Sequence, residues 1–417
     1  MLVLVVPRKY VLAPFIIGAC FLPADQRIII AGLDFTVLRI LVVAGILRLL
    51  VRGENRVVHL NRFDIILFVW VLVGAIVYVL LWLDSRALIY KCGVLFDVLG
   101  LYWLFRLNIR SWSDIIFTFK VLAVSAVALA PFVGYEWSTG HNPFTSVGQV
   151  LTDVRQDRYR CQAAFPHAIM LGLFWATQVP LFIGLATIEK KKLFWALAVG
   201  ASVFIVIASA SSTPLATLVA VCLFLLLYKV RKHGRSIAWA VCGIVILLNL
   251  VMNAPVWHLI SRVNMVGGST GWHRFFLIDQ FVKHFGEWVL IGTRDTSHWG
   301  RGLGDVTNQY IAQGITGGLI TLVLFIYLLV VAVRTVGSFS LRPLPAQMQW
   351  FAWCVCVSML GHCVSFLGVT YFGQIRMLLY LTFAMTSAIY QMSQTADAYQ
   401  SVIRWRAVRP VNVPSQV

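Results

Sequence analysis

Charged residues are scarce in this sequence, and acidic ones are the scarcest. Only 12% of the 417 residues are charged, and 34 lysines and arginines stand against 16 aspartates and glutamates, which gives a net charge of +18. Soluble domains carry charge on about a quarter of their residues, so this composition excludes an ordinary soluble protein. Apolar runs of roughly 20 residues recur, and each is long enough to cross a bilayer as a helix. The sequence predicts an all-α, polytopic integral membrane protein.

Motifs for metals and disulfides are also missing. The chain has no His-Glu-x-x-His and no Asp-x-Asp sequence, and its hydrophilic segments hold no dense cluster of carboxylates. Of the eight cysteines, only Cys161 falls near a hydrophilic loop, and the others sit inside apolar segments. Such cysteines are typical of small packing residues. We therefore expect no metal, no cofactor and no disulfide framework.

About twelve apolar segments are candidate spans. The first contains Pro14 and Pro23 and lacks a clear cleavage site, so it is not a convincing signal peptide. The remainder of the chain alternates between such segments and short connections, which predicts a single membrane domain over residues 1–417. The expected spans are 10–23, 28–51, 63–83, 87–108, 113–133, 164–188, 193–210, 212–229, 236–254, 311–334, 348–369 and 372–392.

The distribution of lysine and arginine indicates the orientation of these spans. With a cytoplasmic N-terminus, most basic residues fall at inside-facing ends, for example Lys190–Lys192 and the cluster from Lys229 to Arg235. Cytoplasmic loops carry such an excess. We expect both termini in the cytoplasm. The net charge follows from this rule and requires no nucleic-acid partner.

Two outside segments, about 134–163 and 255–310, depart from that rule. Together they carry eight cations: Arg155, Arg158, Arg160, Arg262, Arg274, Lys283, Arg294 and Arg301. Long loops cross the membrane largely regardless of charge, so one interpretation is that nothing selected against these cations. The interpretation that we favour is that they face an anion at the outer membrane surface.

The stretch DRYRCQAAFPHAIMLG, residues 157–172, joins two of these arginines to an apolar run. Pro166 predicts a helix that starts near residue 165, because proline fits a first helical turn. Arg160 and His167 then lie around a helix N-terminus, which itself favours an anion, and Arg158 sits just ahead of them. Guanidinium grips phosphate in bidentate fashion. The stretch predicts a phosphate or pyrophosphate site, with a purely capping role as the alternative for His167.

The second loop contains an amphipathic pattern. In WHRFFLIDQFVKHFGEWVLIG, residues 272–292, the apolar positions Phe275, Ile278, Val282, Phe285 and Val289 recur at helical spacing. A helix lying in the membrane interface fits this pattern, and an ordinary helix packed on the bundle is the alternative. The glycine-bearing stretch that follows, up to residue 320, reads as a shaped loop that returns to the membrane.

These residues resemble the O-antigen ligase and polysaccharide polymerase superfamily of bacterial inner-membrane proteins. Residues 157–172 resemble the family motif Arg-x-x-Gly-x-Phe-x-His-Pro-Asn-x-x-Gly at Arg160, Phe165, His167 and Gly172, but lack its Pro-Asn pair. The run Asn308-Gln309-Tyr310-Ile311 is similar to the family's His-Asn-x-Tyr-Leu. The matching motifs cover only about 165–175 and 272–320, with the arginines ahead of them.

The resemblance implies a glycan transferase that needs no metal. Its donor would be a glycan on undecaprenyl pyrophosphate at the periplasmic face, and its acceptor a glycan or a lipid A core. Arg160 and Arg274 would hold the pyrophosphate, with Arg158 and Arg301 in support. Asn308 and Tyr310 would orient the acceptor or the returning loop. Polymerase and ligase remain open alternatives.

One departure concerns the catalytic base. The family histidine falls here on Thr307, which is not a base at neutral pH. His298 and Asp305 are equal candidates for the proton acceptor, and altered chemistry in a divergent branch is the third alternative.

Arg39 falls in the middle of the second expected span, and Lys91 and Asp97 lie within the fourth. Such residues usually pair within the bundle, so we favour interhelical pairs over a proton path.

A transporter or flippase is the rival function class. Against it, the two halves of the chain show no similarity of the kind that many transporters have, and the unusual charges gather in loops.

Overall fold

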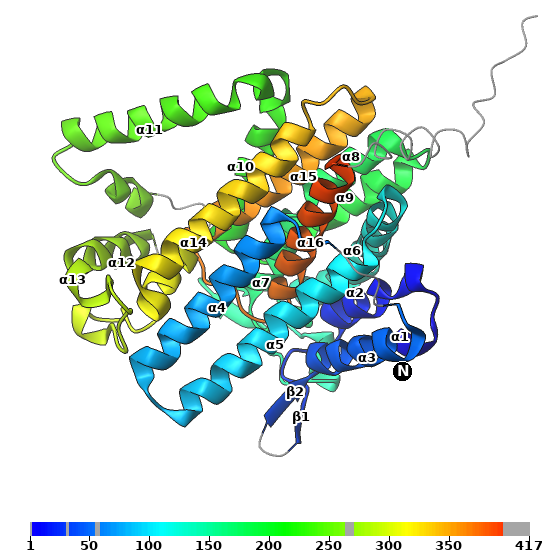
Figure 1. Cartoon of the computed structure of the whole chain (residues 1–417), viewed down its shortest axis with the longest axis horizontal. Coiled ribbons are helices and arrows are strands. Elements are labelled where there is room, and N and C mark those ends of the chain that lie inside the picture. The colour runs from blue at the N-terminus through cyan, green and yellow to red at the C-terminus, as the bar shows by residue number, and fades with distance from the viewer. Residues whose placement is uncertain (1, 31–32, 55–58, 263–270, 395–417) are drawn as a thin grey trace, which may run out of the picture.

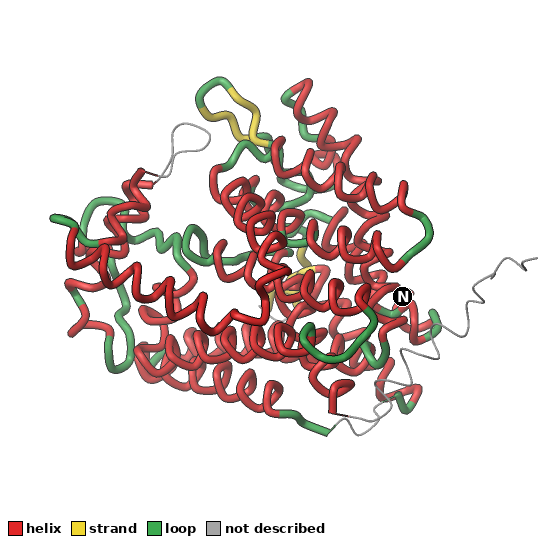
Figure 2. Tube along the Cα trace, turned by 90° about the horizontal axis from the view of Figure 1, so that it is seen from above, coloured by secondary structure: helices red, strands yellow, loops and turns green. Residues whose placement is uncertain are grey.

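The computed structural model describes residues 2–30, 33–54, 59–262 and 271–394, and these residues are overwhelmingly helical (Figure 2). The only strands in this part of the chain form two short hairpins. The all-α prediction is therefore confirmed.

The elements follow one another along the chain in a nearly unbroken series of helices. They are α1 (Leu2–Val5), η1 (Arg8–Tyr10), α2 (Leu12–Phe21), β1 (Arg27–Ile30), β2 (Leu33–Thr36), α3 (Val37–Arg52), α4 (Arg62–Trp82), α5 (Ser85–Asn108), α6 (Trp112–Thr139), η2 (Pro143–Ser146), β3 (Asp153–Arg155), β4 (Arg158–Arg160), α7 (Ala168–Ala176), α8 (Val179–Ile188), α9 (Lys192–Ala208), α10 (Ser212–Leu226), η3 (Leu227–His233), α11 (Gly234–Val251), η4 (Val256–Arg262), α12 (Gly271–Lys283), α13 (Phe285–Trp288), η5 (Ser297–Trp299), α14 (Gln309–Phe339), α15 (Ala346–Ser365) and α16 (Ile375–Gln394).

Seven helical segments within the described residues are long and apolar enough to cross a membrane. All twelve expected spans contain a helix, but several helices are too short: α2 has only 10 residues and α3 has 16. At 1.5 Å per residue, α2 covers about 15 Å, half of a hydrocarbon core. The seven are Arg62–Trp82, Ser85–Asn108, Trp112–Thr139, Ala168–Ile188, Ser212–Val251, Gln309–Phe339 and Ala346–Ser365.

The expected span over residues 28–51 is wrong in its first third. Strands β1 and β2 form a hairpin there, in which Arg27 pairs with Thr36 and the Arg27 guanidinium contacts Asp34 at 3.1 Å. The run of isoleucines at 28–30 suits a strand because β-branched side chains favour extended backbone. The helix α3 then begins at Val37, capped by the Thr36 hydroxyl.

The expected pairing of charges inside helices is confirmed for Arg39 and Asp97. The Arg39 guanidinium donates to both carboxylate oxygens of Asp97 at 2.7 and 2.8 Å, which joins α3 to α5. Lys91 has no carboxylate partner, and its ammonium lies 4.1 Å from the ring centroid of Tyr78. One of the three charges is therefore left without an ion pair among the described residues.

The bundle centres on α14, α15 and α16. Helix α14 packs along α4 and α15, α16 packs along α5, and α15 contacts α8 and α10 (Figure 1). Helix α11 stands apart, and none of its residues is buried. At one end of the bundle a buried polar network joins α4, α5 and α16, because Ser387 and Tyr102 donate to Asp64 and Arg106 donates to Ser387.

Residues 271–299, which contain α12, α13 and η5, form a small helical layer beside one end of α14, which we call the roof (Figure 1). Its own cluster of buried apolar side chains includes Leu277, Phe281, Trp288 and Trp299. A helix forms where the amphipathic helix is expected, but it is shorter. It ends at Lys283, and of the expected apolar positions Val282 and Phe285 are about half exposed, at 50% and 47%.

Glycines lock this roof onto α14. Gly318 interrupts α14 with φ of 68°, so the Leu319 N–H is free to donate to the Val289 carbonyl, and the Thr293 N–H donates to Ile315. A Cβ at Gly292 would meet the Ile315 carbonyl oxygen at 2.1 Å. Only glycine tolerates this combination of positive φ and close approach. The break in α14 therefore fixes where the roof sits.

Candidate functional site

The hairpin β3–β4 presents the first arginines. Its two-residue turn, Gln156 and Asp157, has φ values of 52° and 56°, as a type I′ turn requires. The pairing sets Asp153 opposite Arg160. The Arg160 guanidinium donates to Asp153 at 2.6 Å and to the Ser211 hydroxyl at 2.7 Å. Arg160 is only 6% exposed, and its Nε has no partner in the described structure.

The chain after Arg160 is clamped by a buried carboxylate. Glu136, at the end of α6, accepts the N–H groups of Gln162 and Ala163 at 3.1 and 2.9 Å and the Thr152 hydroxyl at 3.0 Å. The side-chain amide of Asn142 adds a bond to the Ala163 carbonyl at 2.9 Å. The position of Arg160 therefore depends on α6 as well as on its own hairpin.

His167 caps the next helix, as one of the two sequence interpretations holds. Its Nδ1 accepts the Ile169 N–H at 3.0 Å, and α7 begins at Ala168, slightly later than expected. In the neutral ring Nε2 then carries the proton and can donate into the site. Burial lowers the pKa of His167 below its ordinary value, and the Arg160 charge lowers it further, while Asp153 and Asp305 act in the opposite sense.

Arg274 approaches from α12. Its guanidinium donates to the Thr213 hydroxyl at 2.8 Å, and its buried Nε has no partner within the described residues. Burial and, to a lesser degree, the Arg155 charge lower the pKa of Arg274. Because the ordinary pKa of arginine is so high, the guanidinium stays protonated. Gly368 makes room for this contact, since a Cβ there would lie 2.9 Å from Thr213 Cγ2. The charge on Arg274 is thus held without a carboxylate at its side.

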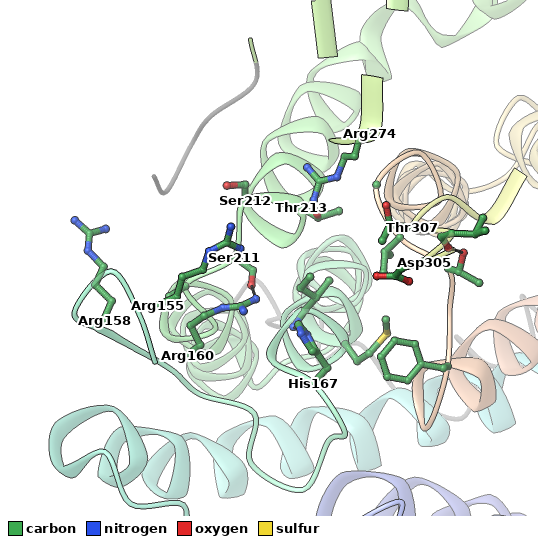
Figure 3. A pocket seen from close by; sticks show the side chains of 18 of the residues that line it. Arg155, Arg158, Arg160, His167, Ser211, Ser212, Thr213, Arg274, Asp305 and Thr307 are labelled. Atoms are coloured by element: carbon green, nitrogen blue, oxygen red, sulfur yellow. Dashed lines mark hydrogen bonds between the residues drawn. The ribbon is translucent and has the colours of Figure 1, made fainter. Parts of the chain in front are cut away.

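These groups line one cavity of about 540 Å³. Arg155, Arg158 and Arg160 line it from the hairpin β3–β4, with Arg158 at the outer edge, and Arg274 lines it from α12 (Figure 3). Asp305 is the one carboxylate among the described residues that line it. Ser211, the residue before α10, and Ser212 and Thr213, in the first turn of α10, add hydroxyls, as do Thr307 and Thr370. The cavity combines an excess of fixed positive charge with a single proton acceptor.

The structure brings together five of the nine residues that the sequence singles out. Arg158, Arg160, His167, Arg274 and Asp305 all line the cavity. The other four lie outside it.

His298 is exposed and bonds Glu287 at 2.8 Å, and its neighbour Trp299 also donates to that carboxylate. These bonds, with that of Trp299 the stronger influence, lower the pKa of Glu287. Arg301 is exposed in the same loop. Neither side chain reaches the cavity.

Asn308 and Tyr310 hold backbone in place. The Asn308 carbonyl oxygen caps α14 by accepting the N–H groups of Tyr310 and Ile311 at 2.9 and 3.1 Å, and its amide donates to Leu367. The Tyr310 hydroxyl donates to the Cys363 carbonyl at 2.9 Å. Asn308 and Tyr310 therefore orient the returning loop, and neither of them lines the cavity.

Sequence reasoning missed the contribution of the turn at residues 209–214. Its serines and threonine sit between two apolar helices, where they read as an ordinary turn. The available signal is Gly172, which the family motif contains. A Cβ there would meet the Ser209 hydroxyl at 2.5 Å and Pro214 at 2.7 Å, so this glycine marks a close approach of α7 to the turn.

Within the described residues, no group of three or more His, Cys, Asp or Glu side chains is arranged to hold a metal ion. The charge that could neutralise an anion in the cavity comes from guanidinium groups.

No family model matches the chain, and no curated protein is significantly similar to it.

Proposed function

We propose that this chain transfers a glycan from an undecaprenyl-pyrophosphate carrier at the periplasmic face of the bacterial inner membrane, during polymerisation or ligation of a surface polysaccharide. The observation that carries the proposal is that Arg160 and Arg274, far apart in the sequence, line the same cavity. Both have a buried Nε without a partner in the described structure, and the cavity holds four arginines against one carboxylate. Arg160 already pairs with Asp153, whereas Arg274 has no carboxylate partner among the described residues. Burying the Arg274 guanidinium in this way is costly unless an anion completes its contacts.

The chemistry needs a leaving-group site and a base. The acceptor hydroxyl oxygen attacks the anomeric carbon, the bond from that carbon to the pyrophosphate oxygen breaks, and the pyrophosphate leaves with the bonding electrons. Arg160 and Arg274 stabilise the charge that develops on it, and the Nε2–H of His167 is placed to add a bond. Asp305 takes the proton of the hydroxyl. The arginines neutralise the leaving group without a metal.

Asp305 is preferred to His298 as the base because only Asp305 lines the cavity. Its carboxylate is exposed there and has no side-chain hydrogen bond or ion pair among the described residues. His298 is engaged with Glu287 on a different surface.

The membrane side of the cavity supports the same function. Its lining residues come from four connecting segments and the helix ends beside them: those between α6 and α7, between α9 and α10, between α11 and α14, and between α15 and α16. The positive-inside rule assigns all four to the outside. A cavity at the end of the bundle, and not halfway along it, favours a transferase over the rival transporter.

The test is complementation of a deletion strain. Lipid-linked single repeat units that accumulate on gels indicate a polymerase, and full-length chains stranded on the carrier indicate a ligase. At equal protein levels, Arg160→Ala and Arg274→Ala are expected to lower glycan production by about 100-fold or more. Arg86→Ala, an exposed arginine at the start of α5, is the matched control and should complement fully. Unchanged glycans in the deletion strain, or normal glycan from Arg274→Ala, would contradict the proposal.

A further inference from the structure

A second cavity of about 210 Å³ lies between α4, α5, α14 and α16. Thr370 lines both cavities, and Tyr371, the next residue, donates its N–H to the Gln309 side chain at 2.9 Å. The two spaces are therefore neighbours at the same end of the bundle, separated by the connection between α15 and α16. The proposed transfer reaction assigns no role to the second one.

Two cations line this second cavity, Lys91 and Arg376, and none of its described lining residues is acidic. The Lys91 ammonium lies over the rings of Tyr78 and Tyr90, and no carboxylate among the described residues pairs with it. Arg376 uses only Nε, which donates to the Tyr371 carbonyl at 2.8 Å, so its two terminal nitrogens have no partner in the described structure. Cations inside a helical bundle are costly and normally paired, so a cavity that collects two of them needs an anion.

The amide side chains in the cavity are oriented as donors. The Gln313 carbonyl oxygen accepts the Trp70 indole N–H at 3.0 Å, and the Gln309 carbonyl oxygen accepts the Tyr371 N–H. Both contacts fix the amide orientation, which leaves the two NH2 groups without a partner among the described residues. The Thr316 hydroxyl already donates to Ala312 at 2.6 Å. Lysine, arginine and two amide groups thus offer donors around one small space.

The cavity opens toward the outer surface of the helices. Tyr90 lines it and is 55% exposed, and its neighbours on α5, Leu88 and Ile89, are 51% and 55% exposed. Helix α5 is one of the helices that are long and apolar enough to cross a membrane. Lys91 lies about 9 Å along it from Ser85, at 1.5 Å per residue. A ligand that enters here has its polar group in the cavity and its apolar part along α5.

We propose that the second cavity binds the phosphate head group of a lipid, independently of the first cavity. The proposal rests on the proposed function only for the identity of that lipid, which would be the carrier of the acceptor glycan. Two neighbouring phosphate sites would then hold the two lipid-linked substrates of one transfer step. Binding itself requires only the cations, the amide donors and the lipid-facing opening.

The test counts bound molecules of farnesyl phosphate, a short isoprenyl phosphate, on the purified protein by native mass spectrometry, with affinities from calorimetry. The wild type is expected to bind two. Lys91→Met/Arg376→Gln should bind one, and so should Arg160→Gln/Arg274→Gln, which alters the first cavity. Arg86→Gln, five residues before Lys91 on α5 and outside both cavities, is the matched control and should bind two.

A gentler variant guards against misfolding. Gln313→Glu keeps the oxygen that accepts from Trp70 but replaces the amide donor with a repelling oxygen, so the second affinity should fall about tenfold or more. Retention of both molecules at unchanged affinity in this variant and in Lys91→Met/Arg376→Gln overturns the inference. The inference is also overturned if equimolar inorganic phosphate fully displaces farnesyl phosphate from the second cavity, or if glucuronate binds there in its place. Either result would show that the cavity does not select a lipid phosphate. If the wild type binds one molecule, and only Lys91→Met/Arg376→Gln abolishes that binding, the result contradicts the proposed function and leaves the second site intact.

Discussion

Asp305 is the residue on which the proposed chemistry depends most narrowly, because it is the single carboxylate among the described residues that line the cavity. Asp305→Asn keeps the shape of the side chain and removes its basicity, so glycan transfer should fall by about 100-fold or more. Donor binding should be unchanged or tighter, because one negative charge leaves a space lined by four arginines. Transfer assays and binding of farnesyl pyrophosphate measure the two effects separately.

His298→Gln is the comparison variant for Asp305→Asn. Since His298 bonds Glu287 away from the cavity, its replacement should leave transfer near the wild-type rate. The opposite pattern, an active Asp305→Asn and an inactive His298→Gln, would move the base to His298.

His167 should make the fold sensitive to acid. Burial and Arg160 lower its pKa in the folded protein below the ordinary value of 6.5, so the unfolded chain binds a proton at a higher pH than the folded one. Stability is then complete above about pH 6.5 and declines as pH falls toward the lowered folded pKa. His167→Asn retains a good helix cap and does not titrate. Thermal midpoints measured across this range should fall less in His167→Asn than in the wild type, and equal declines would contradict the assignment.

Residue patterns predicted the members of the cavity better than they predicted their roles. Arg160 and Arg274 were identified because cations on the disfavoured side of a membrane need a reason. Asn308 and Tyr310 matched a motif, yet their side chains hold backbone groups of α14, Leu367 and Cys363. A one-dimensional spacing does not say whether a polar group turns toward a cavity or toward an orphan carbonyl.

Among the elements, the connection between α15 and α16 separates the two cavities, and Gly368 fits it closely against Thr213 and Arg274. A Cβ at Gly368 would lie 3.2 Å from the Thr213 hydroxyl and 3.5 Å from Arg274 Nε. Gly368→Ala should therefore displace Arg274 and lower transfer by roughly tenfold or more, since small misplacements at a reacting centre are costly.

Gly200→Ala is the matched control for Gly368→Ala. Gly200 lies in α9, and a Cβ there would meet nothing within 4 Å. Alanine favours a helix over glycine, so this variant should keep its activity and its thermal midpoint. Full activity of Gly368→Ala would show that the connection does not position Arg274.

Element boundaries were predictable where local chemistry alone decides them. The N-terminal ends of α4 and α5 follow from their N-cap residues, Asn61 and Asp84. Apolar content does not distinguish a strand from a span and does not show where α12 ends, so the hairpin β1–β2 and the length of α12 are not predictable from it. In α12 the buried side is selected by tertiary contacts of Leu277 and Phe281, and an apolar periodicity with several possible faces does not reveal that choice.

At the scale of the whole molecule, segments far apart in the sequence meet at one end of the bundle. Arg160 and Thr213 precede a long roof segment, and Arg274 returns from that roof to contact Thr213. The bias of lysine and arginine in the sequence predicts that all of these connections lie on one side of the membrane. The agreement is informative because a wrong parity in any intervening helix would have placed Arg160 and Arg274 at opposite ends.

The side of the membrane on which that end lies is the last prediction. In a background where the exposed cysteines Cys92, Cys222 and Cys242 are replaced by alanine, Leu151→Cys and Leu290→Cys should react with a membrane-impermeant maleimide added to intact spheroplasts. Both leucines are highly exposed, at 76% and 80%, and lie in the two arginine-bearing loops. Lys191→Cys, exposed at the other end of the bundle, should react only after the membrane is opened. The reverse result would place the arginine cavity on the cytoplasmic side, where a carrier in the periplasmic leaflet cannot reach it. Both proposals would then require lipid-linked substrates in the cytoplasmic leaflet.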